Sequence, residues 1–203
     1  QEDSGRVVKV QPGFCIIATA NEKSKRYKGV DDLSVEFQNR FGANINRVRY
    51  PDHDKGYDKY PRENAQLAMA AVATKRGEVP PDIDEGDFEN FVRAARLSQQ
   101  IFSGTNGEGY DQFIDTERMV DNRPGLEETV LAPRTMVDIL HKVVGSYGVV
   151  SLKRACQTFL DGIKNPNDRK VMHHILEYHD LLPEEMLRKT PEEAGDNEET
   201  DES

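Results

Sequence analysis

The sequence predicts an α/β protein in three parts: parallel strands with a helix over residues 1–60, helices over residues 61–182, and a disordered acidic tail at 183–203. Gly13–Ala20 is a short continuous apolar run, which is typical of a central strand buried on both faces. From Pro61 onward, strong helix formers and apolar residues at helical spacing replace that pattern. Residues 184–203 contain nine acidic and two basic residues and no apolar periodicity, which favours disorder.

Charge and composition limit the classes of protein to which this chain can belong. The tail carries a charge of −7 out of the total of −10, which leaves −3 for residues 1–183 and makes the body nearly neutral. No run approaches the roughly 20 apolar residues of a membrane span, and residues 1–13 lack the apolar region of a signal peptide. Cys15 and Cys156 each lie in an apolar pattern and are expected to be reduced core residues. We therefore predict a cytoplasmic protein without a membrane partner.

Residues 1–60 are expected to hold strand, loop, helix and strand in that order. Arg6–Val10 alternates weakly and could form one arm of a hairpin before the apolar run. Asp31 or Asp32 can cap a short helix that continues through Phe37. Ala43–Pro51 then has the composition of another strand. Because the chain opens on Gln1 with a strand pattern, we expect it to be a piece of a longer protein.

The helical part is predicted from caps and spacing. Pro61 suits the first turn of a helix that Gly77 ends, and Gly104 ends the next one. Asn165 and Pro166 mark the start of the last helix. Residues 105–125 form a long polar connection, and loops of that length are usually functional or mobile. The predicted helices span residues 61–77, 84–103, 133–146 and 151–161, and the last one begins at Pro166. The second of them places five apolar residues on one face: Phe88, Phe91, Val92, Ala95 and Phe102.

The segment "FCIIATANEKSKRYKGVDDLSVEFQNRFG" resembles the sensor-1 strand, connecting loop and arginine-finger segment of AAA+ ATPases. The likeness is to the group that contains MoxR-type ATPases, the ATPase subunit of aerobic cobalt chelatase and midasin-like dynein relatives. Its matching elements are Thr19-Ala20-Asn21, Tyr27-Lys28-Gly29, Leu33-Ser34 and Asn39-Arg40-Phe41. The resemblance implies that residues 1–60 are the C-terminal part of a P-loop core and residues 61–182 the helical lid.

A second likeness lies in "LAPRTMVDIL", residues 131–140, which is similar to the "SPRT" start of the lid helix in cobalt-chelatase ATPases, with Ala132 in place of serine. Arg134 falls where the family has its sensor-2 arginine. The N-terminus of a helix favours anions, and an arginine adds a forked donor for phosphate. An arginine at this positive end is otherwise disfavoured, so a bound anion would resolve the conflict.

Two ATPase motifs are absent from the sequence. There is no G-x-x-x-x-G-K-[ST] phosphate loop, and no apolar run ends in Asp-Glu to bind magnesium and activate water. In the family both motifs precede the sensor-1 strand. We therefore expect ATP and Mg²⁺ to be bound mainly by residues upstream of this chain.

The resemblance assigns roles to three residues. Asn21 would help to position the attacking water, and Arg134 would contact the γ-phosphate from the lid of the same subunit. Arg40 would reach the nucleotide of the neighbouring subunit, which requires a homo-oligomeric ring, commonly a hexamer in this class. The implied work is remodelling or metal-chelatase-type motor activity, with a von Willebrand A domain protein as a further partner.

Other interpretations stay open. Within the same class, a DNA-directed protein such as a helicase loader is an alternative, although the near-neutral body has no dense basic stripe for nucleic acid. A non-hydrolysing interaction module is the alternative from another class. Asp52, Asp54, Asp58 and Glu63 fit a calcium loop poorly, because Gly56 comes one place early. The pair His173 and Glu177 is too small for a zinc site, so no metal ligands are predicted.

Overall fold

The structure is a computed structural model that describes residues 9, 11–15, 17–19, 34–42, 46, 48–56, 58–104, 119–120 and 123–184. The chain divides into two compact units, Gln1–Ile45 and Asn46–Ser203. Each unit is described by itself. The predicted tail at 183–203 lies outside the described residues apart from its first two positions.

The described residues of the first unit form one helix and no strand. Helix α1 spans Val35–Phe41, so it continues one turn beyond the predicted end at Phe37, and the two candidate caps lie outside the described residues. The described residues of the apolar run at 13–20 adopt no strand. Phe14 is 64% exposed and Ile17 86% exposed. Cys15 is also exposed, so the prediction that it belongs to a core is wrong.

The predicted fold class is wrong. Strands were expected at 13–20 and at 43–51, but the described residues of both segments lie outside any sheet. A parallel strand needs a neighbour to pair its backbone groups, and the described residues of 1–60 provide no such ladder. The strands that are described, β1 (Met119–Val120) and β2 (Arg123–Pro124), form a two-residue antiparallel pair within the polar connection. The described chain is therefore helical, and it does not form the end of a P-loop α/β core followed by a lid.

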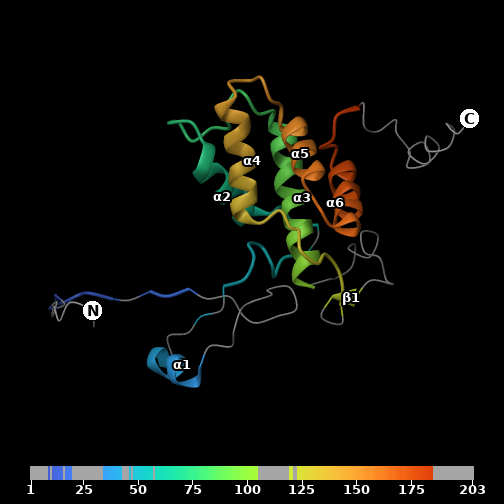
Figure 1. The fold of residues 1–203 in the computed structure, drawn as a ribbon. Helices are drawn as coiled ribbons and strands as arrows, with labels where there is room; N and C mark the ends of the chain where they lie inside the picture. Colours follow the sequence, from blue (N-terminus) through green and yellow to red (C-terminus); the bar gives the residue numbers. More distant parts are fainter. Residues whose placement is uncertain are drawn as a thin grey trace, which may run out of the picture. The chain divides into compact units, whose positions relative to one another are not determined.

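The described residues of the second unit form five helices (Figure 1). Their starts follow ordinary capping rules: Asp84 and Ser151 accept first-turn N–H groups from their own helices, as short polar residues at this position commonly do. Gly104 ends the longest helix in the left-handed conformation, with φ of 69°. The helices are α2 (Arg62–Val72), α3 (Glu85–Ser103), α4 (Pro133–Gly145), α5 (Leu152–Asp161) and α6 (Pro166–Tyr178).

Helix α3 lies at the centre of this unit. It contacts α2, α5 and α6, while α4 packs on α2 and α5 (Figure 1). The apolar face predicted for α3 is confirmed, because all five of its predicted members are buried: Phe88, Phe91, Val92, Ala95 and Phe102. Tyr50 packs edge-on against Phe102, with 6.2 Å between ring centroids. Residues just before α2 therefore belong to the packing of the helical unit.

The C-terminal half of α3 is buried on all sides. Every residue from Ala94 to Phe102 is buried, including four polar ones: Arg96, Ser98, Gln99 and Gln100. Buried polar groups need hydrogen-bond partners, and those of α3 bond to the segments before α2 and before α4. The polar residues of α3 thus decide where these two segments lie.

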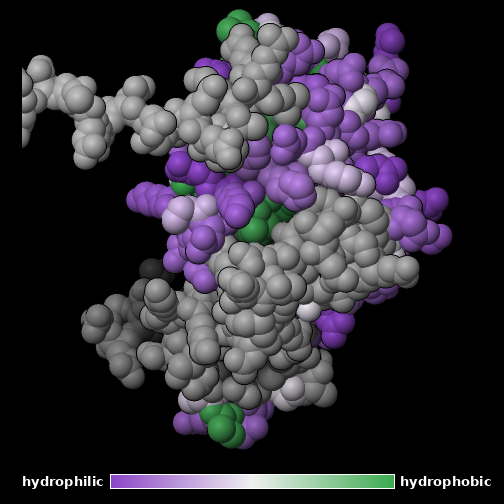
Figure 2. Space-filling model, turned by 90° about the vertical axis from the view of Figure 1, so that its right-hand side faces the viewer, coloured by the Kyte–Doolittle hydropathy of each residue, from purple (hydrophilic) through white to green (hydrophobic). Residues whose placement is uncertain are grey.

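On the face that Figure 2 draws, hydrophilic residues predominate among the described residues, and hydrophobic ones form small separate patches. Within the described part of the chain, no helix is long and apolar enough to cross a membrane. Cys156 is buried in the core as predicted, and burial raises the pKa of its thiol.

His179, at the end of α6, is a buried titratable group. It is 9% exposed, and burial together with the nearby Arg93 lowers its pKa from 6.5 to about 4. Between pH 6.5 and pH 4, His179 is therefore mostly protonated in the unfolded state and mostly neutral in the folded state. Stability contributed by the neutral ring is complete above pH 6.5 and is lost as the pH falls from 6.5 towards 4.

We expect the free energy of unfolding to fall between pH 7 and pH 5, with roughly 1–2 kcal/mol of that loss due to His179. The free energy of unfolding is measured by urea unfolding at pH 7 and at pH 5, for the wild type and for His179→Gln. The variant should lose that share of the pH dependence, whereas His174→Gln, which changes an exposed histidine of the same helix, should keep it. Equal pH dependence in wild type and H179Q would contradict this assignment.

Candidate functional site

Arg134 lies in the first turn of α4, and its side chain is exposed. Ala132 is the N-cap residue, with extended backbone angles (φ −65°, ψ 160°) and no side-chain hydrogen bond to the helix. Pro133 occupies the first turn, and no acidic residue is present there. The N–H groups of Arg134 and Thr135 consequently have no hydrogen-bond acceptor among the described residues.

The other four helices of this unit use side-chain oxygens at their starts. Asp84 accepts from the N–H of Asp87 at 3.0 Å in α3, and Ser151 accepts from that of Arg154 at 3.2 Å in α5. Asn165 accepts from two N–H groups of α6, and the Asp52 carboxylate accepts from two of α2. Among α2–α6, only α4 begins without such an acceptor.

The electrostatics at the start of α4 are unbalanced. A helix N-terminus carries about half a positive charge from its aligned peptide dipoles, and the Arg134 guanidinium adds a full one. Asp138 stands four residues later on the same helix, the spacing at which ion pairs form, but it is not within ion-pair distance of Arg134 in the structure. Two free N–H groups and a forked cation suit an oxyanion such as phosphate.

The start of α4 is held in place through Leu131. The Leu131 N–H donates to Ser98 Oγ at 3.1 Å, and the Leu131 carbonyl accepts from Gln99 Nε2 at 2.7 Å. Leu131 is fully buried. Both of its backbone polar groups are therefore bonded to two consecutive residues of α3, one position before the N-cap of α4.

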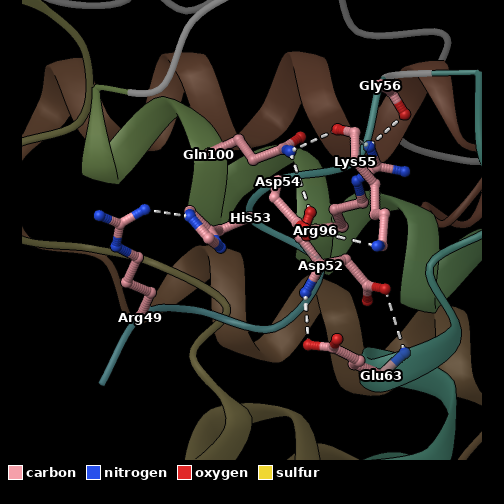
Figure 3. A network of polar contacts seen from close by, with 9 residues as sticks. All are labelled: Arg49, Asp52, His53, Asp54, Lys55, Gly56, Glu63, Arg96 and Gln100. Atoms are coloured by element: carbon pink, nitrogen blue, oxygen red, sulfur yellow. Dashed lines mark hydrogen bonds and ion pairs between the residues drawn. The ribbon is translucent and has the colours of Figure 1, made fainter. Parts of the chain in front are cut away.

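Gln99 connects this contact to the start of α2. Its Nε2 also donates to Asn64 Oδ1 at 3.0 Å, and Asn64 Nδ2 donates to Asp52 Oδ2 at 3.1 Å. Asp52 and Glu63 bond reciprocally, each carboxylate accepting the other's backbone N–H (Figure 3). A continuous hydrogen-bonded network thus runs from the start of α2 through α3 to the start of α4.

Asp168 holds the segment that leads into Leu131. Its carboxylate, fully buried in the first turn of α6, accepts from the N–H groups of Glu127 at 3.0 Å, Glu128 at 2.8 Å and Thr129 at 2.9 Å. Three N–H bonds to one carboxylate satisfy a buried charge. Residues 127–131 are therefore fixed from both α6 and α3, and the direction in which α4 presents Arg134 is set by the fold.

The three residues predicted to act on ATP do not form one described site. Asn21 lies outside the described residues. Arg40 belongs to α1 in the first unit, where its guanidinium pairs with Glu36 at 2.8 Å and its side chain is 73% exposed. Arg134 belongs to the second unit. Their convergence on one nucleotide stays a prediction.

The acidic run before α2 has a role in the local structure. The Asp52 carboxylate accepts from two N–H groups of the first turn of α2, and the Glu63 carboxylate, which belongs to that turn, accepts the Asp52 N–H. Asp58 pairs with Lys59 at 2.8 Å and Asp54 with Lys55 at 3.4 Å. The hydrogen bond from Lys59 lowers the pKa of Asp58. Within the described ranges, no three His, Cys, Asp or Glu side chains are arranged to hold a metal ion. His173 and Glu177 lie 3.7 Å apart as an i, i+4 pair.

Ser98, Gln99 and Asp168, which position the start of α4, were not predicted from the sequence. A signal existed in the apolar residues that flank Ser98 and Gln99 closely on both sides, Leu97 and Ile101. Comparisons with protein-family models, with curated proteins and with solved structures find no match for this chain.

Ser98→Ala tests whether α3 holds the start of α4. The substitution removes the acceptor for the buried Leu131 N–H, which should lower the free energy of unfolding by roughly 1–2 kcal/mol and speed hydrogen exchange at the Leu131 amide. Ser103→Ala is the matched control, because the Ser103 hydroxyl makes the same bond to the carbonyl three residues earlier. If hydrogen exchange at the Leu131 amide is unchanged in S98A, the conclusion that Ser98 fixes the start of α4 is wrong.

Proposed function

We propose that this chain acts in an ATP-hydrolysing AAA+ ring ATPase, in which Arg134 detects the γ-phosphate of bound ATP. The observation that carries the proposal is an exposed, unpaired arginine at the start of α4, beside first-turn N–H groups without acceptors among the described residues. An oxyanion is the ligand that satisfies both the dipole and the guanidinium.

The residues at this position fit one phosphate group and not a metal ion. The guanidinium of Arg134 and the N–H groups of Arg134 and Thr135 would hold phosphate oxygens. No acidic residue of the first turn of α4 is available for Mg²⁺, so the cation and the other phosphates are assigned to residues elsewhere. Bound ATP supplies the phosphoryl group that passes to water, and Arg134 would hold that group in position.

The other roles follow from the resemblance. Asn21 would orient the attacking water, and Arg40 would supply positive charge to the nucleotide of the next subunit. Arg40 is exposed on α1 and bonded only by a surface pair within the described chain, which a competing phosphate can displace because exposed pairs are weak. A finger that acts between subunits requires a ring, and a hexamer is our proposal. Its work is remodelling or metal-chelatase-type motor activity in the cytoplasm, with a von Willebrand A domain partner.

A non-hydrolysing interaction module is the second candidate. It is favoured by one observation, the absence from the sequence of both the phosphate loop and an apolar run ending in Asp-Glu. In that case Arg134 would still bind an anion, but binding would not be coupled to hydrolysis. The two candidates differ in whether the assembled protein hydrolyses ATP.

Arg134→Gln tests the proposed function by ATP hydrolysis of the complete assembled protein. Loss of charge-assisted hydrogen bonds to phosphate should lower the rate roughly 10- to 100-fold. Lys142→Gln removes the same charge from the last turn of the same helix and should leave the rate near that of the wild type. Equal rates for R134Q and K142Q would rule out the phosphate contact, and a wild type without ATP hydrolysis would favour the interaction module.

A further inference from the structure

A cavity lies in the helical unit, between α3, the segment before α2 and the end of α6. Its volume is about 280 Å³. Arg93, Arg96 and Gln100 line it from α3, Lys59 from the segment before α2, and Tyr178 and His179 from the end of α6. None of these residues belongs to the start of α4. The size suits a small molecule or a single charged group of a larger one.

Arg96 brings a buried positive charge to this cavity. The side chain is 3% exposed, and its guanidinium donates to the carbonyl oxygens of Gly56 and of Lys55, the latter at 2.6 Å (Figure 3). It also donates to the carbonyl oxygen of Lys59. These acceptors are neutral, and no carboxylate of the described residues lies within ion-pair distance of Arg96. Its Nε has no hydrogen-bond partner. The charge is therefore solvated by dipoles and not neutralised.

Two further groups add to this polarity. Arg93 is half-buried, and its guanidinium lies over the Tyr60 ring, 5.4 Å from the centroid. His179 is buried, and its Nε2 also has no hydrogen-bond partner. A buried polar atom without a partner costs stability. Both Arg96 and His179 line this cavity.

The charge balance of the cavity favours an anion. Three basic side chains, Arg93, Arg96 and Lys59, line it, and Asp58 is the acidic residue among the described residues that line it. The Asp58 carboxylate is paired with Lys59 Nζ at 2.8 Å. Removing that pair from the count leaves two guanidinium groups. The Nη1 and Nη2 donors of Arg96 are engaged by three carbonyls, so the forked donor that can meet the oxygens of a phosphate is that of Arg93.

We propose that this cavity binds the phosphate group of a small molecule, with Arg93 as its direct ligand and Arg96 as the buried charge behind it. Arg93 can turn towards a ligand because only a ring contact holds it, whereas Arg96 is fixed by three carbonyls. The Tyr178 ring lines the same cavity and offers an apolar face to the organic part of a phosphate ester. The site does not depend on the function proposed for Arg134.

Phosphate titration of the full chain, followed through the ring signals of His179 by NMR at pH 7, tests the proposal. We expect a saturable shift in the wild type and an apparent Kd roughly 10- to 100-fold higher in Arg93→Gln. Arg93 is half-buried, so the variant should stay folded, and unchanged amide signals of the α4 and α5 cores check this. Phenyl phosphate, as a second probe, should bind more tightly than inorganic phosphate if the natural ligand is a phosphate ester and equally if it is free phosphate.

Two control variants separate this cavity from other phosphate contacts. Arg154→Gln removes an exposed arginine of α5, and Arg134→Gln removes the one at the start of α4; neither should change the titration of His179. The proposal is overturned if the His179 signals do not respond to phosphate, if R93Q leaves the apparent Kd unchanged, or if R134Q abolishes the response. A failure here leaves the role of Arg134 untouched, because that role is read out by ATP hydrolysis.

Discussion

The pair of hydrogen bonds between α3 and Leu131 is the constraint on which the helical unit depends. Ser98 and Gln99 bind both backbone polar groups of the buried Leu131. These two bonds fix the residue that precedes the N-cap of α4. Asp168 fixes the three residues N-terminal to Val130 from α6, and Asn64 connects Gln99 to α2. Four helices thus meet through buried polar contacts, and their apolar faces pack around that framework.

This framework fixes the position of Arg134, and a fixed position is what makes this arginine informative. An exposed arginine on a flexible segment can move to any partner, so its position says little. Arg134 is presented by a helix whose start is bonded on two sides, and the first turn offers no acceptor among the described residues for its free N–H groups. Preorganised donors are what a phosphate-binding position needs, because they cost little reorganisation when the ligand arrives.

The helices could be predicted because their signals are local. Asp84, Ser151 and Asn165 act as caps in the structure, Gly104 ends α3, and the 3.6-residue spacing identified the buried face of α3. The expected strand at 13–20 failed because its composition indicates burial only if other segments cover it. In the described structure Phe14 and Ile17 are exposed. A sheet is a long-range arrangement, and the apolar run alone does not specify its partners.

The candidate sites differ in the same way: residues in a local sequence pattern could be predicted, and residues placed by long-range contacts could not. Arg134 was predicted from a local stretch, residues 131–140, by its resemblance to a lid-helix start and by the proline before the arginine. Arg96, Gln99 and Asp168 could not be found in that way, since their partners lie 32 to 41 residues away in sequence. A polar residue buried in a helix resembles one on a solvated face until the neighbouring segments are known. The pocket of Arg93 and His179 depends on such contacts too.

The central claim is that Arg134 is kept at the positive end of α4 for an anion and not for stability. The most direct measurement is the free energy of unfolding of Arg134→Gln and Lys142→Gln in buffer without phosphate or nucleotide. Removing a cation from a helix N-terminus should leave stability unchanged or raise it by about 0.3–1 kcal/mol, and removing one from the C-terminus should lower it by a similar amount. A loss of stability in R134Q equal to or larger than that in K142Q would contradict the account.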